Sequence, residues 1–236
     1  MDTIEIIIST IFSIAIGLFA GLTVIYIFNR IPAKWLCDYD EEPDKGMWGE
    51  RIKKKPWQIV FALVFVAISV KLMYQGYQYQ IAGLIAIWLL LQIGIADKKY
   101  MIIPDQFVIA LAVTALGFIY YHPTFLSPLY GALIGGGSLL LIGIIGKLIL
   151  KKEAMGFGDV KLMCAVGLIS GIKGTLVILV LTIISSGLIF GIGLLLRLVK
   201  RDEEQPLGPF ISASAALYLL FIDELNLAAD FYLSLY

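Results

Sequence analysis

Apolar segments long enough to cross a lipid bilayer dominate this sequence. A transmembrane helix needs about 17–25 mostly apolar residues, and the first such run covers residues 4–28. Sixty per cent of the 236 residues are hydrophobic, against about 45–50% in soluble proteins. A soluble fold of this size could not bury that much apolar surface. We therefore expect an all-α integral membrane protein.

The apolar runs predict a bundle of about eight transmembrane helices, at residues 4–28, 57–74, 80–96, 104–121, 128–149, 158–171, 174–197 and 208–222. These runs divide the chain into an amino-terminal helix (1–28), a short cytoplasmic loop (29–56) and a multi-helix membrane domain (57–236). No basic residue precedes the first run, so we expect a permanent helix there rather than a cleaved signal peptide.

Lysine and arginine are divided very unequally between the two sets of predicted loops. One side has only Lys71 and Lys173. The other side has sixteen: Arg30, Lys34, Lys45, Arg51, Lys53, Lys54, Lys55, Lys98, Lys99, Lys147, Lys151, Lys152, Lys161, Arg197, Lys200 and Arg201. Short loops rich in these residues stay in the cytoplasm. The count predicts a multi-pass membrane protein with both termini outside.

Other features predict what the chain binds. Membrane lipid is the expected partner of Trp35, Trp48 and Trp57 at the headgroup level, and of the basic run 53–55. The net charge is zero, so nothing indicates nucleic-acid binding. The pattern predicts no oligomeric state.

Metal ligands are scarce in the sequence. Two cysteines, Cys37 and Cys164, and one histidine, His122, cannot form a usual four-ligand zinc site without carboxylates. We expect free thiols, no metal and no cofactor.

Three glycine pairs are spaced four residues apart: Gly131 and Gly135, Gly167 and Gly171, Gly187 and Gly191. This spacing is typical of helices that pack closely in membranes.

Two aspartates lie at the ends of predicted transmembrane helices, and carboxylates at membrane depth are costly and usually functional. Asp97 ends the run LLLQIGIA, and Asp159 opens the sixth helix within GFGD. Both should lie on the cytoplasmic side. Two neighbouring carboxyl groups can share one proton, so that one activates a water molecule while the other protonates the attacked carbonyl. This pattern predicts aspartic-protease chemistry.

The alternative is a transporter or a proton or cation channel in which Asp97 and Asp159 form a relay. Such proteins often carry internal repeats and place their ionisable groups near the middle of the membrane. The sequence shows no convincing repeat, and both acids lie at helix ends. We therefore favour the protease.

Three motifs follow one another at predicted helix ends: ADKKYMIIPD (96–105), MGFGDVKLM (155–163) and PLGPF (206–210). Over about residues 90–222 the chain resembles the type IV prepilin peptidase family, membrane aspartic proteases of the GxGD type. The resemblance implies that Asp97 and Asp159 are catalytic. It also implies a prepilin or pseudopilin substrate, cut on the cytoplasmic side before its hydrophobic helix. The same resemblance implies a prokaryotic cell membrane and a role in type IV pilus assembly or protein secretion.

The same motifs contain residues that we expect to bind substrate or support the loops: Pro104, Asp105, Gly156, Phe157, Gly158, Lys161, Gly208, Pro209 and Phe210. The glycines of GFGD let the backbone approach an extended peptide. Asp105 after Pro104 is also typical of a helix start, which we favour. Lys161 either acts on the aspartates and substrate or extends to the lipid headgroups.

The amino-terminal part departs from the family. Bifunctional members have a first helix that reads GSFLNVVIxRLP and a cytoplasmic domain with paired CxxC motifs, which is associated with N-methylation. Here the loop 29–56 has only Cys37. The sequence thus gives no support for N-methyltransferase activity or for a zinc-stabilised domain.

The loop 29–56 also contains an acidic run: Asp38, Asp40, Glu41, Glu42 and Asp44. By the family resemblance, prepilin leaders are short and basic and enter from the cytoplasm. The acidic run is therefore a candidate leader-binding surface. The alternative, which we weigh slightly higher, is that nearby lysines and Arg51 already neutralise it.

Overall fold

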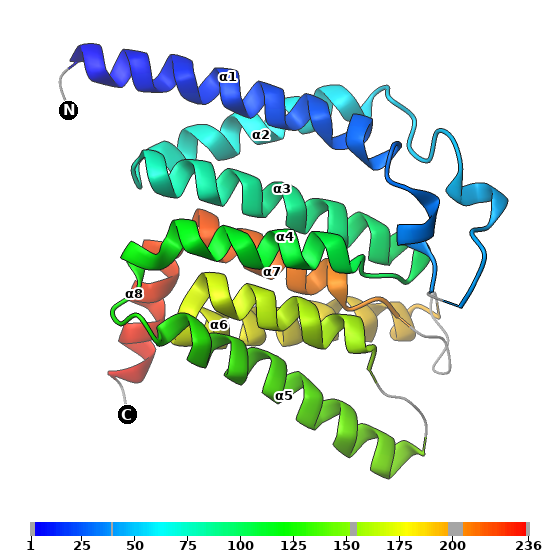
Figure 1. Ribbon diagram of the computed structural model, residues 1–236. Helices are drawn as coiled ribbons and strands as arrows, with labels where there is room; N and C mark the ends of the chain where they lie inside the picture. The colour runs from blue at the N-terminus through cyan, green and yellow to red at the C-terminus, as the bar shows by residue number, and fades with distance from the viewer. Residues whose placement is uncertain (1–2, 39, 152–154, 198–204, 235–236) are drawn as a thin grey trace.

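The computed structural model describes residues 3–38, 40–151, 155–197 and 205–234, and all regular structure in these ranges is helical. The helices are α1 (Thr3–Phe28), α2 (Trp57–Met73), α3 (Tyr77–Tyr100), α4 (Asp105–Thr114), α5 (Ser127–Leu150), α6 (Phe157–Leu195), α7 (Gly208–Leu220) and α8 (Ile222–Leu233). Short 3-10 segments cover Ala33–Leu36, Lys45–Met47 and Ala115–Tyr121. Figure 1 shows the long helices running side by side between two ends of a bundle. The predicted all-α fold is confirmed.

Four helices, α1, α3, α5 and α6, are each long and apolar enough to cross a membrane. Two shorter apolar helices cover Trp57–Met73 and Asp105–Tyr121. The pair α7 and α8 passes the same test only when taken together, and it is bent by 96°. The chain is therefore a multi-pass helical membrane protein, while the number of eight spans stays a prediction.

The longest helix, α6, is interrupted at Gly171. A continuous helix of 39 residues would be about 58 Å long, nearly twice the hydrocarbon core of about 30 Å. Gly171 leaves the helical conformation with φ 65° and ψ −172°, a region open mainly to glycine. Figure 1 shows the chain reversing within α6. The two halves, 157–171 and 172–195, agree with the predicted helices at 158–171 and 174–197.

Glycines bring the backbones of α5 and α6 into contact. A Cβ atom at Gly131 would lie 2.4 Å from the carbonyl oxygen of Gly167, and one at Gly167 would lie 2.4 Å from that of Gly131. The packing role predicted for these two residues is confirmed. It is wrong for Gly187 and Gly191, since nothing in the described chain would lie within 4 Å of their Cβ atoms.

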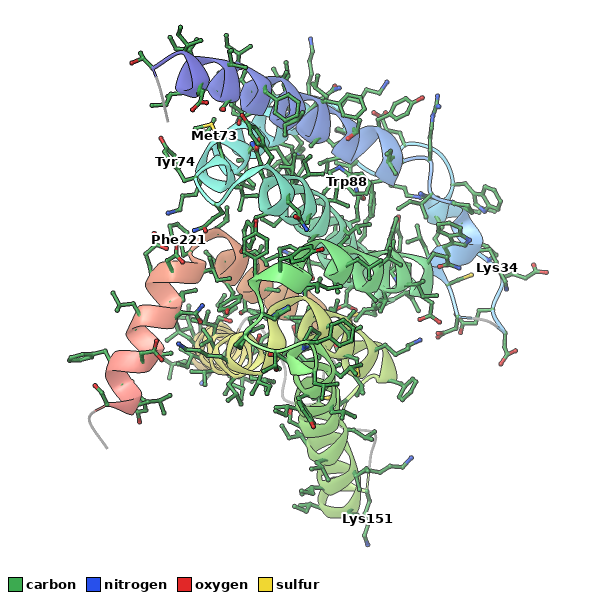
Figure 2. The ribbon with its side chains drawn as sticks, turned by 60° about the vertical axis from the view of Figure 1, so that its left-hand side comes forward. Lys34, Met73, Tyr74, Trp88, Lys151 and Phe221 are labelled. Carbon is green, nitrogen blue, oxygen red and sulfur yellow. The ribbon has the colours of Figure 1, made fainter. Side chains whose placement is uncertain are left out.

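Beyond this contact α5 leads away from the bundle, and Figure 2 shows Lys151 at its far end.

The loops gather at the two ends of the bundle (Figure 1). The first, here called the loop end, has the loop 29–56, the α3–α4 turn and the start of α6. The other, here called the α8 end, has the α2–α3 turn, α8 and the reversal within α6. Figure 2 shows Lys34 at the loop end, and Met73, Tyr74 and Phe221 at the α8 end. α1 begins at the α8 end, so the described chain starts and finishes on the same side of the bundle.

Helix α8 was not predicted. Its acidic residues lower its hydropathy, and they pair with the two lysines that the charge count assigned to this side. Lys71 forms an ion pair with Glu224 at 2.7 Å, and Lys173 forms one with Asp230 at 2.6 Å. Of the basic residues assigned to the loop end, Lys152, Lys200 and Arg201 lie outside the described residues.

Candidate active site

A cavity of about 810 Å³ lies at the loop end, within the size range of ligand sites. Four parts of the chain line it. These are the loop after α1 (Lys34, Trp35, Cys37, Asp38), the α3–α4 region (Asp97, Met101–Gln106), the start of α6 (Met155–Asp159, Lys161), and the end of α6 with the segment before α7 (Ser186, Phe190, Gln205–Leu207). All three motifs singled out from the sequence contribute to these walls.

Asp97 lies in the last turn of α3, which continues to Tyr100 rather than ending at residue 96 as predicted. Its side chain lines the cavity, and the residue is only 5% exposed. The backbone N–H of Gly208 donates a hydrogen bond to Asp97 Oδ2 at 2.9 Å. A Cβ atom at Gly208 would lie 2.6 Å from the same oxygen. Gly208 therefore orients the carboxyl group of Asp97 through its N–H, and its lack of a side chain leaves the space that this carboxyl group occupies.

Asp159 lies in the first turn of α6, where a negative charge suits the helix dipole. It lines the same cavity as Asp97 and is within electrostatic range of it. Its Oδ1 atom is buried and has no hydrogen-bond partner in the described residues. The carboxyl groups of two separate helices thus share one space, with a polar atom left for a bound water or substrate.

Asp105 and Lys161 form an ion pair that joins the first turn of α4 to the first turn of α6. Both residues line the cavity. The Lys161 ammonium also lies 5.6 Å from the centre of the Phe157 ring. The pair fixes the two helix starts relative to each other. Lys161 therefore lies at the cavity, paired with Asp105, rather than extending to the lipid headgroups.

The other residues of the GFGD motif form part of the cavity wall. A Cβ atom at Gly158 would lie 3.1 Å from the Cβ of Ile103, so this position needs a small residue. Gly156 precedes α6 as its N-cap. Phe157 is 67% exposed and presents an apolar ring at the cavity. Pro104 precedes α4 and also lines the cavity.

The PLGPF motif lies partly at the cavity wall and partly outside it. Gly208, Pro209 and Phe210 do not line the cavity, whereas Pro206 and Leu207 do. The ring of Phe210 packs edge-on against Phe190, a lining residue, with 4.9 Å between ring centres.

The acidic run in the loop 29–56 is only partly at the site. Asp38 is exposed and lines the cavity. The other four acids, Asp40, Glu41, Glu42 and Asp44, are exposed but are not among the lining residues. The predicted leader-binding surface therefore reaches the cavity through one of its five members.

Trp35 is a lining residue that the sequence interpretation missed. It was predicted at the lipid headgroups, like Trp48 and Trp57, which are 65% and 51% exposed. Instead Trp35 is half-buried and packs edge-on against Phe107 of α4, with 6.2 Å between ring centres. No local sequence signal separates it from the other two.

Metal ligands do not cluster in the described part of the chain. It contains no group of three or more histidine, cysteine, aspartate or glutamate side chains placed to hold a metal ion. Cys37 and Cys164 are free thiols.

Helical spans that bring two aspartates to one cavity define a class of protein: a polytopic membrane protein with a paired-carboxyl site. Residues 84–192, which include both aspartates, match the model of the type IV leader peptidase family. Over this membrane region the chain is similar to the type IV leader peptidase family.

Proteins named prepilin leader peptidase/N-methyltransferase show the same similarity. The Aeromonas salmonicida (strain A449) protein is 34% identical over 151 residues, which are 62% of this chain and 51% of that protein. The Pseudomonas aeruginosa protein is 31% identical over 160 residues, or 64% of this chain and 53% of that protein. The Aeromonas hydrophila protein is 29% identical over 176 residues, or 72% and 58%. The matches thus span about half the length of these relatives. No solved structure matches the chain.

Proposed function

We propose that this protein is an aspartic endopeptidase that removes the leader from a prepilin or pseudopilin precursor. The observation that carries the proposal is the meeting of Asp97 and Asp159, from α3 and α6, at one cavity. The family match and the names of the relatives support the substrate class. In this proposal residues 57–236 are the peptidase domain, preceded by α1 and the loop 29–56.

The proposed mechanism needs only the two carboxyl groups and a water molecule. Two carboxyl groups in one space share a proton, because ionising both is costly. The ionised one takes a proton from the water as it attacks the scissile carbonyl, and the protonated one donates its proton to the carbonyl oxygen. When the C–N bond of this tetrahedral intermediate breaks, the carboxyl group that took the water's proton passes it to the leaving amine. The other carboxyl group takes a proton back from a hydroxyl of the intermediate, so that the starting state is restored. The Gly208 N–H keeps Asp97 oriented, and Phe157 and its neighbouring glycines border the peptide.

We do not extend N-methylation to this chain. The relatives carry that activity in their names, but the matches cover about half of each. The loop 29–56 has a single cysteine where the bifunctional pattern has pairs. No observation favours the transporter alternative, since both aspartates lie at one end of the bundle.

Incubation of the purified protein in detergent with a pilin precursor tests the proposal. We expect a single cut before the hydrophobic segment of the precursor, identified by mass spectrometry of both products. A chelator should leave the rate unchanged, because the proposed chemistry uses no metal. Absence of cleavage with several precursors, or loss of activity on chelation, would contradict the proposal.

We also propose that the loop end faces the cytoplasm. This orientation follows from the unequal division of lysine and arginine. Single cysteines placed at Lys45 and Phe125, both exposed, test it in a background without Cys37 and Cys164. A membrane-impermeant maleimide added to intact cells should label position 125 and spare position 45. The reverse pattern would show that the orientation is wrong.

The acidic run gives a further kinetic prediction. A basic leader that docks on exposed carboxylates contributes equally to substrate and transition-state binding, so its loss raises KM and leaves kcat nearly unchanged. Because Asp38 lines the cavity, Asp38→Asn should raise KM more than Glu42→Gln does. Added salt should raise the KM of the wild type and narrow the difference between it and Asp38→Asn. Equal KM values for all three proteins at low salt would assign the run to a solvated loop.

A further inference from the structure

Arg51 is a buried residue of the loop 29–56 that holds the two ends of this loop together. The residue is 8% exposed. Its guanidinium donates hydrogen bonds to the carbonyl oxygens of Phe28, Ile31 and Met47 at 2.6–2.8 Å. Phe28 ends α1, where carbonyl groups lack partners within the helix. Burial lowers the pKa of Arg51, but an arginine starts so high that it stays charged at neutral pH. The buried charge therefore depends on this set of carbonyl groups.

Asn29 and Lys99 complete the closure. The Asn29 side chain accepts hydrogen bonds from the N–H groups of Arg51 and Ile52 at 3.0 and 2.9 Å, and it donates one to the Ile52 carbonyl at 2.9 Å. The Lys99 ammonium donates to the Arg51 carbonyl. Lys99 follows Asp97 by two residues in the last turn of α3. The two ends of the loop are thus tied to each other and to the helix that carries the first aspartate.

This closure fixes the segment after α1 against the cavity. Leu36 and Cys37 are buried, and the ring of Trp35 packs on Phe107. Trp35 and Asp38 line the cavity together with both aspartates. Arg51 and Asn29 thus hold in place the segment that carries Trp35, whose half-buried indole forms part of the cavity wall.

We propose that Trp35 is a substrate-positioning residue and that Arg51 acts through it by holding the loop in place. An apolar side chain of the extended peptide, next to the scissile bond, packs against the indole. Met101, Ile103 and Phe157 are further apolar residues that line the same cavity. The proposal rests on the proposed peptidase function and extends it to a specific contact outside the three family motifs.

Trp35→Ala tests the indole, and Trp48→Ala is the matched control because Trp48 is 65% exposed and does not line the cavity. With a pilin precursor, Trp35→Ala should raise KM at least about tenfold with kcat within about twofold, since packing holds substrate and transition state alike. Trp35→Phe keeps a ring against Phe107, so its KM should stay within about threefold of wild type. Trp35→Gln takes the place of Trp35→Ala if that variant does not fold.

The thiol of Cys37 reports on Arg51 without any substrate. Cys37 is 8% exposed, and its Sγ lies 3.5 Å from the Glu41 carbonyl oxygen. In a Cys164→Ala background, Arg51→Lys should raise the rate of maleimide labelling of Cys37 about tenfold or more. The lysine ammonium cannot replace the planar guanidinium in all of its hydrogen bonds to carbonyl groups, so the loop opens more often and exposes the thiol. Lys54→Ala, at an exposed position three residues away, should leave the rate unchanged. Arg51→Lys should also raise KM in the same direction as Trp35→Ala.

The outcomes separate this proposal from the function on which it rests. A wild type that cleaves no precursor overturns both. An active wild type with unchanged KM in Trp35→Ala overturns the positioning role alone, as does a fall in kcat at constant KM. Unchanged Cys37 labelling in Arg51→Lys overturns the role of Arg51.

Discussion

Asp97→Asn and Asp159→Asn are each expected to reduce kcat for precursor cleavage by about 10³-fold or more, the upper part of the range for general acid–base catalysis. Asparagine is nearly the same size as aspartate, so the cavity keeps its shape. An amide neither takes a proton from water nor returns one to a carbonyl, and the remaining carboxyl group cannot do both. Initial rates of product formation, measured with saturating precursor in detergent, give the comparison.

The double variant sharpens this result. If the two carboxyl groups act as a unit, Asp97→Asn combined with Asp159→Asn should be no slower than the slower single variant. Asp223→Asn, at the α8 end, is the control and should keep wild-type activity, because its carboxylate contacts Gln75 far from the cavity. Substantial cleavage by either single variant, or a double effect equal to the product of the single effects, would contradict a shared role.

Gly208→Ala is expected to reduce kcat by about 10²-fold, because a misplacement of about 1 Å at a catalytic group has effects of this size. The new Cβ would lie 2.6 Å from Asp97 Oδ2 and 3.0 Å from its carboxyl carbon. The helix start cannot yield easily, so the aspartate side chain must turn away and lose the Gly208 hydrogen bond. The fold should survive, since the clash is with the far end of one side chain.

Gly187→Ala is the matched control for this substitution. Nothing in the described residues would lie within 4 Å of its Cβ atom, so activity should be unchanged. Thermal unfolding in detergent should show both variants folded. Wild-type activity in Gly208→Ala would show that the position of Asp97 does not depend on Gly208.

The sequence allowed prediction of the helical class and of the residues that meet at the cavity. Asp97 and Asp159 could be found because each lies at the end of a long apolar run and within a motif that resembles the family. The break in α6 was predictable because a mostly apolar stretch of 39 residues is longer than one membrane crossing needs. Asp105 and Lys161 were named individually. Their pairing depends on how α4 and α6 pack, and the sequence around either residue does not indicate it.

Residues that act through tertiary contacts were missed. Arg51 was counted among cytoplasmic charges, since nothing local distinguishes a buried arginine from the exposed lysines that follow it. Trp35 was interpreted by residue type alone, although Phe107 is more than seventy residues away in the chain. Helix α8 was missed because its acids are compensated by Lys71 and Lys173, two residues from other parts of the chain.

The reversal at Gly171 sets a limit on where the second aspartate lies relative to the two faces of the membrane. The helical segment 157–171 has fifteen residues and spans about 22 Å, less than the hydrocarbon thickness of about 30 Å. Asp159 lies only about 18 Å along the helix from Gly171. A rod of that length cannot reach from one membrane face to the other. If the reversal reaches the outer face, Asp159 lies inside the hydrocarbon region, short of the inner face. Its depth in the membrane is then set by twelve residues of rigid helix and not by a flexible loop.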